Sequence, residues 1–225
     1  MAIVLIPGFM LDADLWSDIS HDLEPFGPII HADPAHAGSI EEMAAQTLAA
    51  APGAVTIIGF SMGGYVAREV QRKAPERVSK LVLIATSARG DGTVQAQRKA
   101  TVAAAGLSTF RGLSKASIRR SLAPDHRDEA VIIHRIQAMG IRFGAEVFRR
   151  QALFRRDGDL KDLPAITCPT LIVAGSKDRL RSLDESAEMH AAIPNSRIEV
   201  VEAGHMIPIE APAALSAPLR DFLTG

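Results

Sequence analysis

The chain has 225 residues, of which 47% are hydrophobic and 23% are charged, an ordinary composition for one globular domain. A formal net charge of −1 gives no reason to expect a nucleic-acid partner. No apolar run approaches the roughly 20 residues that a membrane helix needs, so no membrane partner is expected either.

The amino terminus and the cysteine content favour a cytoplasmic protein. The stretch Met1–Pro7 has no positively charged region before its apolar residues, unlike a signal peptide. Cys168 is the only cysteine, which excludes an internal disulfide and fits a reducing compartment. The sequence contains neither the Cys/His spacing of a zinc site nor a glycine-rich phosphate loop, so no metal and no cofactor are expected.

Short apolar, β-branched runs alternate with helical patterns along the chain. This alternation predicts an α/β fold with a mostly parallel sheet of about six strands and helices on both faces. We expect strands near Ile3–Ile6, Pro28–His31, Val55–Ile58, Lys80–Ala85, Thr170–Ala174 and Arg197–Val201. We expect helices near Ile40–Ala50, Met62–Lys73, Asp184–Ala192 and Ala213–Leu223.

The third expected strand ends in Gly59-Phe60-Ser61-Met62-Gly63, and a helical pattern follows directly. Glycines two residues before and two residues after the serine let the strand and the helix approach without a Cβ clash. A serine hydroxyl is a weak nucleophile, so it must stand exposed beside a base and near donors for an oxyanion. The strand–turn–helix context therefore predicts that Ser61 is a nucleophile.

Strand patterns disappear between about Arg89 and Leu163, and helical spacing of apolar residues replaces them. Two sets recur at this spacing: Ile132, Ile133, Ile136 and Met139, and then Phe143, Val147 and Phe154. We therefore divide the chain into a core of residues 1–88 and 164–225 and a helical insert of residues 89–163.

Each of the last two expected strands is followed by a residue that could assist Ser61. Asp178 follows the strand at Thr170–Ala174, and His205 follows the strand at Arg197–Val201. The carboxyl ends of parallel strands share one edge of the sheet, where ligand sites gather. Asp184 is an alternative acid, but Asp178 lies closer to its strand and is preferred.

With these motifs in place, the chain resembles the α/β-hydrolase superfamily over nearly its whole length. The segment Gly59–Gly64 is similar to the nucleophile elbow, and Gly175–Asp178 is similar to the acid turn. The segment Gly204–Pro212 resembles the histidine loop of serine carboxylesterases and of enol-lactonase-like members. Leu5–Phe9 resembles the oxyanion loop, although Pro7 stands where family members usually carry His. The order Ser, Asp, His is also the order of the family's triad.

The resemblance implies an α/β-hydrolase fold in which the insert forms a helical lid over the serine. It also implies a catalytic triad of Ser61, Asp178 and His205. The backbone N–H groups of Phe9 and Met62 are expected to form the oxyanion hole. A peripheral helical layer without a substrate role remains the alternative for the insert.

The predicted function is hydrolysis of small carboxylic esters or lactones through an acyl-enzyme. One alternative is a hydrolase of C–C bonds in β-diketone-type substrates, which uses the same triad. Another is a non-catalytic ligand receptor on the same scaffold. The sequence does not choose an oligomeric state.

Three residues are candidates for substrate binding, namely Met10, Arg135 and Arg142. Met10 neighbours the expected oxyanion loop. Residues 90–160 contain 13 Lys/Arg and 7 Asp/Glu, a net +6 against −7 for the rest of the chain. Arginines of such a basic lid could bind an anionic substrate through a carboxylate. The alternative is that they cover the solvent faces of amphipathic helices.

Overall fold

The computed structural model describes residues 1–92, 97, 101 and 110–225. Its centre is a six-stranded sheet in the order β2-β1-β3-β4-β5-β6, in which all neighbouring strands pair in parallel. The strands are β1 (Ala2–Ile6), β2 (Ile29–His31), β3 (Val55–Phe60), β4 (Val78–Ile84), β5 (Thr170–Gly175) and β6 (Ser196–Val201). The predicted fold class is confirmed, and each expected strand lies within two residues of its observed bounds.

The strand order places the loop after β1 next to the loop after β3. The chain runs from β1 outward to β2 and then returns to β3 on the other side of β1. In register, Leu5 of β1 faces Ile58 of β3, so both strands end at about the same height. An open parallel sheet binds ligands at such a switch point, outside the carboxyl ends of its strands. The loops after β1 and β3 meet at that place.

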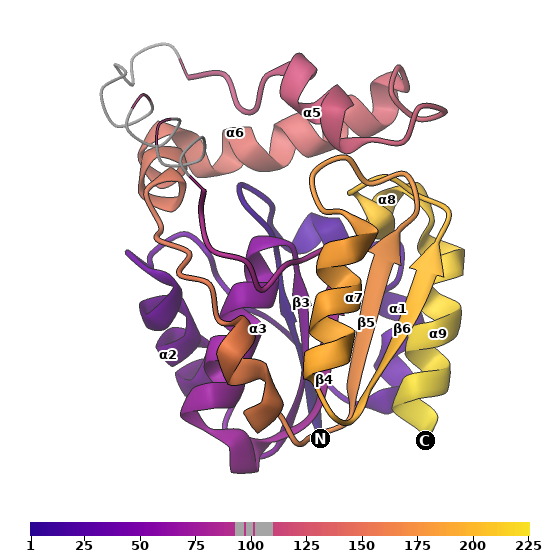
Figure 1. The fold of residues 1–225 in the computed structure, drawn as a ribbon. Helices are drawn as coiled ribbons and strands as arrows, with labels where there is room; N and C mark the ends of the chain where they lie inside the picture. The colour runs from indigo at the N-terminus through magenta and orange to yellow at the C-terminus, as the bar shows by residue number, and fades with distance from the viewer. Residues whose placement is uncertain (93–96, 98–100, 102–109) are drawn as a thin grey trace.

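Helices cover both faces of the sheet (Figure 1). The α-helices are α1 (Ser20–Leu23), α2 (Ile40–Ala50), α3 (Met62–Lys73), α5 (Lys115–Ser121), α6 (Ala130–Ala152), α7 (Leu183–Ala192), α8 (Ile207–Glu210) and α9 (Pro212–Thr224). The short 3-10 helices are η1 (Ala13–Trp16), η2 (Glu24–Phe26), η3 (Pro75–Arg77) and η4 (Leu160–Ala165). The predicted bounds of α2 and α3 are confirmed without change.

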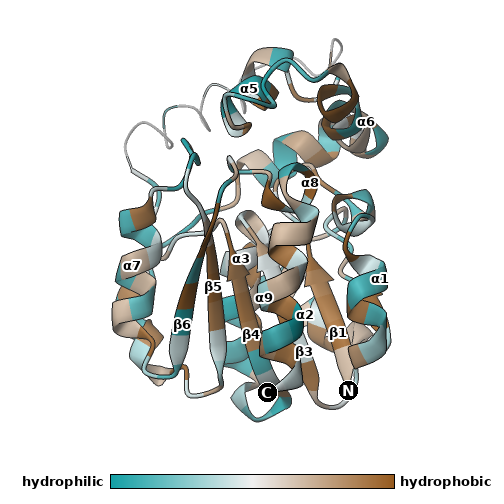
Figure 2. Ribbon diagram, turned by 90° about the vertical axis from the view of Figure 1, so that its right-hand side faces the viewer, coloured by the Kyte–Doolittle hydropathy of each residue, from teal (hydrophilic) through white to brown (hydrophobic). Residues whose placement is uncertain are grey.

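The apolar strands seen in Figure 2 serve two cores, one on each face. Along β1, Ile3 and Leu5 belong to the core beneath α1 and α9, whereas Val4 and Ile6 belong to the core beneath α2, α3 and α7. Successive side chains of a strand point to opposite faces, so a strand covered on both faces must be apolar throughout.

A layer formed by α5 and α6, which we call the α5–α6 layer (residues 110–152), lies across the carboxyl edge of the sheet (Figure 1). Ile133, Ile136 and Met139 are buried in the same core as Phe60 at the end of β3. Helix α6 is broken at Gly144, where φ is 75°, and Phe154 lies beyond its end, so the expected helical spacing through Phe154 is wrong. The wider insert of residues 89–163 stays a prediction, since parts of it lie outside the described residues.

Candidate active site

Ser61 occupies a sharp turn between β3 and α3. Its φ of 51° and ψ of −111° lie in a region that non-glycine residues rarely adopt. The backbone of the turn is held from β4, because Ser61 N donates to Ile84 O at 2.8 Å and Thr86 Oγ1 donates to Ser61 O at 2.7 Å. Such strain persists only where the surroundings over-determine it, often at functional sites.

Two glycines make this turn possible. A Cβ on Gly59 would lie 2.4 Å from Gly63 O, and a Cβ on Gly63 would lie 2.2 Å from Ile6 O. Neither backbone oxygen can move away without disturbing the sheet or the helix. The motif therefore requires glycine at both positions for a steric reason, as the sequence indicated.

The three residues selected from the strand ends meet at this edge of the sheet. His205 Nε2 lies 2.9 Å from Ser61 Oγ, and His205 Nδ1 lies 2.7 Å from Asp178 Oδ2. The side chains of His205 and Asp178 are 7% and 1% exposed. This is the geometry in which a carboxylate fixes one imidazole tautomer and leaves the other nitrogen free to accept a proton from serine.

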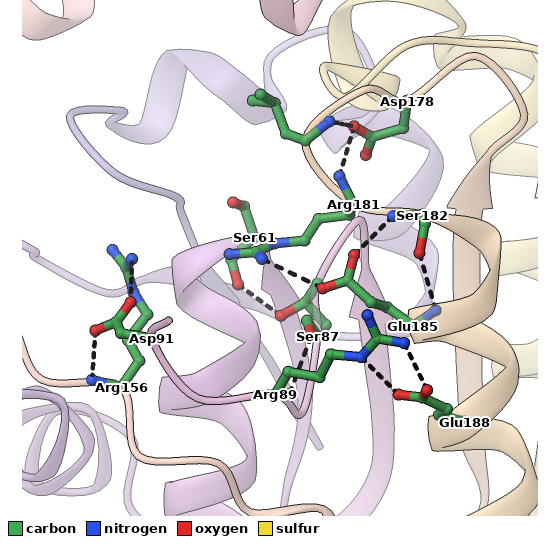
Figure 3. A network of polar contacts seen from close by, with 12 residues as sticks. Ser61, Ser87, Arg89, Asp91, Arg156, Asp178, Arg181, Ser182, Glu185 and Glu188 are labelled. Carbon is green, nitrogen blue, oxygen red and sulfur yellow. Dashed lines mark hydrogen bonds and ion pairs between the residues drawn. The ribbon is translucent and has the colours of Figure 1, made fainter. Parts of the chain in front are cut away.

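The Asp178 carboxylate is held by its own loop (Figure 3). Asp178 Oδ1 accepts the N–H groups of Leu180 at 2.7 Å and Arg181 at 3.0 Å, which leaves Oδ2 for His205. The loop then enters α7 through a capping box between Ser182 and Glu185. Asp184, the rival acid in the sequence, lies exposed in the first turn of α7.

The histidine loop is tied to the end of α5 by Glu210, whose role the sequence did not reveal. Glu210 Oε2 accepts N–H groups of Ala123 at 2.6 Å and Gly204 at 3.2 Å, while Oε1 accepts that of Met206 at 2.9 Å. Burial raises the pKa of the Glu210 carboxyl, and the three backbone N–H groups oppose that effect. The only sequence signal was an acidic residue inside an apolar loop.

The expected oxyanion donors belong to the loop after β1 and to the first turn of α3. Phe9 follows β1, and Met62 is the first residue of α3, where helix N–H groups have no intrahelical partner. Neither N–H group meets an acceptor among the residues that the structure describes. Both remain available to a ligand oxygen.

A small cavity of about 160 Å³ opens beside Ser61. It is lined by Phe9, Leu11, Phe60, Ser61, Leu113, Ser117, Ile118, Ser121, Ile136, Leu180, His205 and Met206. Apart from His205, no lining residue in the described part of the chain carries an ionisable side chain. The cavity therefore offers an apolar surface with a few hydroxyl groups.

The candidate substrate-binding residues Met10, Arg135 and Arg142 do not line this cavity. Arg135 Nε pairs with Asp14 at 3.1 Å, and Arg142 Nε pairs with Asp12 at 2.6 Å, so both guanidinium groups face the segment after β1. The hydrogen bonds that Arg142 donates to the Asp12 carboxylate raise the pKa of Arg142. Met10 is fully buried. The sequence identified the basic residues of α6, but it could not show that Arg135 and Arg142 form ion pairs with Asp14 and Asp12.

A larger hollow of about 870 Å³ lies between α3 and η4 and contains none of the candidate residues. Its lining includes five basic and five acidic side chains, among them Arg68 and Asp159, whose charged groups lie 2.6 Å apart. Among the described residues, no three His, Cys, Asp or Glu side chains form a group that could hold a metal ion. No helix in the same residues is long and apolar enough to cross a membrane.

Comparison with known proteins identifies the family of the chain. The model of the alpha/beta hydrolase family matches residues 3–217. The pimeloyl-[acyl-carrier protein] methyl ester esterase of Photobacterium profundum is 29% identical, with 98% of this chain and 94% of that protein aligned. Of the first three curated relatives, two are aligned over less than two thirds of their own length, 64% and 61%.

Solved structures show the same architecture. A thermophilic esterase from Thermogutta terrifontis superimposes with a TM-score of 0.89 at 27% identity, covering 100% of this chain and 89% of that one. The enol-lactonase of Burkholderia xenovorans LB400 has a TM-score of 0.87 at 20% identity, with coverage of 100% and 91%, and shows the shared fold. The chain therefore belongs to the alpha/beta hydrolase family.

Proposed function

We propose that the protein is a serine hydrolase of small carboxylic esters or lactones. The observation that carries this proposal is the hydrogen-bonded series Ser61–His205–Asp178 beside an apolar cavity. Hydrolases of this kind act by acyl transfer, and a lactone is a cyclic ester that reacts in the same way.

In this proposal Ser61 Oγ attacks the substrate carbonyl while His205 Nε2 takes the hydroxyl proton. The oxyanion of the tetrahedral intermediate accepts hydrogen bonds from the backbone N–H groups of Phe9 and Met62. His205 then gives its proton to the departing alkoxide, which leaves an acyl group on Ser61. Water, deprotonated by His205, attacks that acyl group, and His205 then returns this proton to Ser61 Oγ as the bond to the acyl group breaks and the acid is released.

Asp178 acts on this cycle through His205. Its carboxylate accepts the Nδ1 proton, keeps Nε2 free for Ser61 and stabilises the imidazolium formed after proton transfer. The low exposure of both side chains strengthens this electrostatic effect, because little water screens it.

We also propose that the α5–α6 layer is the lid of the site. It supplies Leu113, Ser117, Ile118 and Ile136 to the cavity wall, so it limits what can lie beside Ser61. The wall is apolar and the space is small, which favours uncharged substrates with short acyl groups. The esterase and methyl ester esterase relatives support the same bond type.

A substrate panel tests this function. We expect p-nitrophenyl acetate and butyrate to be cleaved with higher kcat/KM than the octanoate, and some methyl esters or lactones to be substrates. Ser61→Ala should lose turnover while its circular dichroism spectrum stays unchanged. Cleavage of a β-diketone with no ester or lactone cleavage would favour the C–C hydrolase instead, and binding without any turnover would favour a receptor.

A further inference from the structure

Residue Gln151, in the last turn of α6, makes two buried hydrogen bonds to loops that follow neighbouring strands. Its Oε1 accepts Met10 N–H at 2.9 Å, and its Nε2 donates to Pro34 O at 3.0 Å. Its side chain is fully buried. A donor on one side and an acceptor on the other fix the orientation of the amide.

The loop that Gln151 contacts after β1 contains the proposed oxyanion donor Phe9. Leu11 N donates to Gly8 O at 3.2 Å, which closes a turn with Phe9 and Met10 at its centre. Met10 has a φ of 58°, and a positive φ at this third position is typical of type II turns, which prefer glycine there. A methionine in this conformation needs a contact that keeps it there.

The Gln151 amide provides that contact. A turn of this kind loses its positive φ when the central peptide, whose N–H belongs to Met10, flips over. The hydrogen bond to Gln151 holds this N–H in place inside the protein. A second contact from the same stretch of α6 supports the turn, because the rings of Phe148 and Phe9 lie 5.5 Å apart. Phe148 and Gln151 are three residues apart and share one helix face.

We infer that Gln151 is a positioning residue that keeps the turn around Phe9 in the form needed to stabilise the oxyanion. This inference rests on the proposed function. It makes the second part of α6, after the break at Gly144, a support for the oxyanion loop as well as a part of the lid. Gln151 does not line the cavity, so it acts through Met10 and Phe9 rather than on the substrate.

The test uses Gln151→Met, which keeps the approximate size of the side chain and removes both hydrogen bonds. We expect kcat for p-nitrophenyl butyrate to fall about tenfold to a hundredfold, which is less than the 10²–10³-fold cost of losing an oxyanion donor outright, with KM nearly unchanged. The affinity for an aryl boronic acid, which forms a tetrahedral adduct on Ser61, should fall by a similar factor. The pH profile should keep its shape, since the contacts of His205 are untouched.

Gln46→Met is the control, because Gln46 lies on α2, outside the α5–α6 layer and the cavity wall, and donates to Glu42 Oε1 at 3.3 Å instead of contacting the turn. It should leave kcat and boronate affinity within about twofold of wild type. Gln151→Glu is a second variant, which keeps an acceptor for Met10 N–H and should retain more activity per folded molecule than Gln151→Met.

Several results would overturn the inference. One is that the wild type is active and the Gln151→Met variant has a kcat and a boronate affinity within about twofold of the wild-type values. Another is an equal loss of kcat and of substrate binding, which would indicate collapse of the lid. If neither Gln151 variant folds, Gln151 serves stability and the positioning role is wrong. A wild type that cleaves no ester or lactone and binds no boronate would instead overturn the proposed function, and the inference with it.

Discussion

At the scale of single residues, Asp178 accepts three hydrogen bonds, two from its own loop and one from His205. Asparagine can keep the bonds to the loop, but its NH₂ group then faces His205 Nδ1. That arrangement places the imidazole proton on Nε2, where it blocks acceptance of the Ser61 proton.

We therefore expect Asp178→Asn to lower kcat by about 10⁴-fold while the unfolding transition changes little. Asp184→Asn is the control, since Asp184 lies exposed at the start of α7. Steady-state kinetics and thermal unfolding of the two variants check the assignment. A large loss in Asp184→Asn with an active Asp178→Asn would show that the acid is misplaced.

Glu210 gives a prediction about pH. Burial raises the pKa of its carboxyl above the ordinary glutamate value, so the folded protein keeps this proton to a higher pH than the unfolded chain does. The contribution of Glu210 to the free energy of unfolding then falls as pH rises from the ordinary value through the raised one.

Glutamine at this position does not titrate, so wild type should lose stability relative to Glu210→Gln as pH rises from the ordinary glutamate pKa toward neutrality. Urea unfolding of both proteins across this range measures the difference. The opposite trend would mean that the three backbone N–H groups outweigh burial and hold the carboxylate ionised.

At the scale of elements, the break in α6 sets the direction of its last part. Gly144 has a φ of 75° and nothing within 4 Å of a built Cβ, so an added methyl group would meet a conformational cost and no clash. Gly140 lies in a helical turn of the same helix, and a Cβ there would have ordinary contacts, the nearest at 3.5 Å.

We expect Gly144→Ala to lower the free energy of unfolding by about 1–3 kcal/mol, because its φ of 75° and ψ of −178° lie in a region essentially restricted to glycine. Gly140→Ala should raise it by up to about 1 kcal/mol, since alanine is the better helix former. Chemical denaturation of both variants gives the comparison. A harmless Gly144→Ala would show that α6 can run on without its break.

The ion pairs between α6 and the segment after β1 also bear on substrate choice. Arg135 and Arg142 pair with Asp12, Asp14 and Asp18, so their charges are compensated where they lie. The basic composition of the insert therefore does not place a free positive charge in the cavity wall among the described residues.

A half-ester and its methyl-capped diester should accordingly have kcat/KM values within about threefold of each other at low ionic strength, or favour the diester. Kinetics of the matched pair at low and high salt provide the check. A preference for the anionic half-ester that salt weakens, and that Arg142→Gln removes, would restore the role suggested by the sequence.

At the scale of the whole molecule, local patterns predicted the sheet and the position of the candidate triad. Each strand is a short apolar run, and Ser61, Asp178 and His205 each follow the end of one. Because parallel strands have their carboxyl ends at the same edge of the sheet, assigning the strands also predicts that the residues directly after them lie close together in space.

Contacts between distant segments could not be predicted in this way. Gln151 meets Met10 across 141 residues of sequence, and Arg142 meets Asp12 across 130. A helical pattern shows which residues share a face, but not which loop that face covers. The break of α6 at Gly144 could not be predicted either, because a glycine can lie within a continuous helix or interrupt one.

The central claim is that Ser61 is the nucleophile, and covalent labelling tests it most directly. We predict that a fluorophosphonate adds one phosphonyl group per chain, that peptide mapping places it on Ser61, and that esterase activity falls in proportion to labelling. Ser61→Ala should remain unlabelled. Loss of activity with the label on another residue, or full hydrolysis by a stoichiometrically labelled protein, would contradict the account.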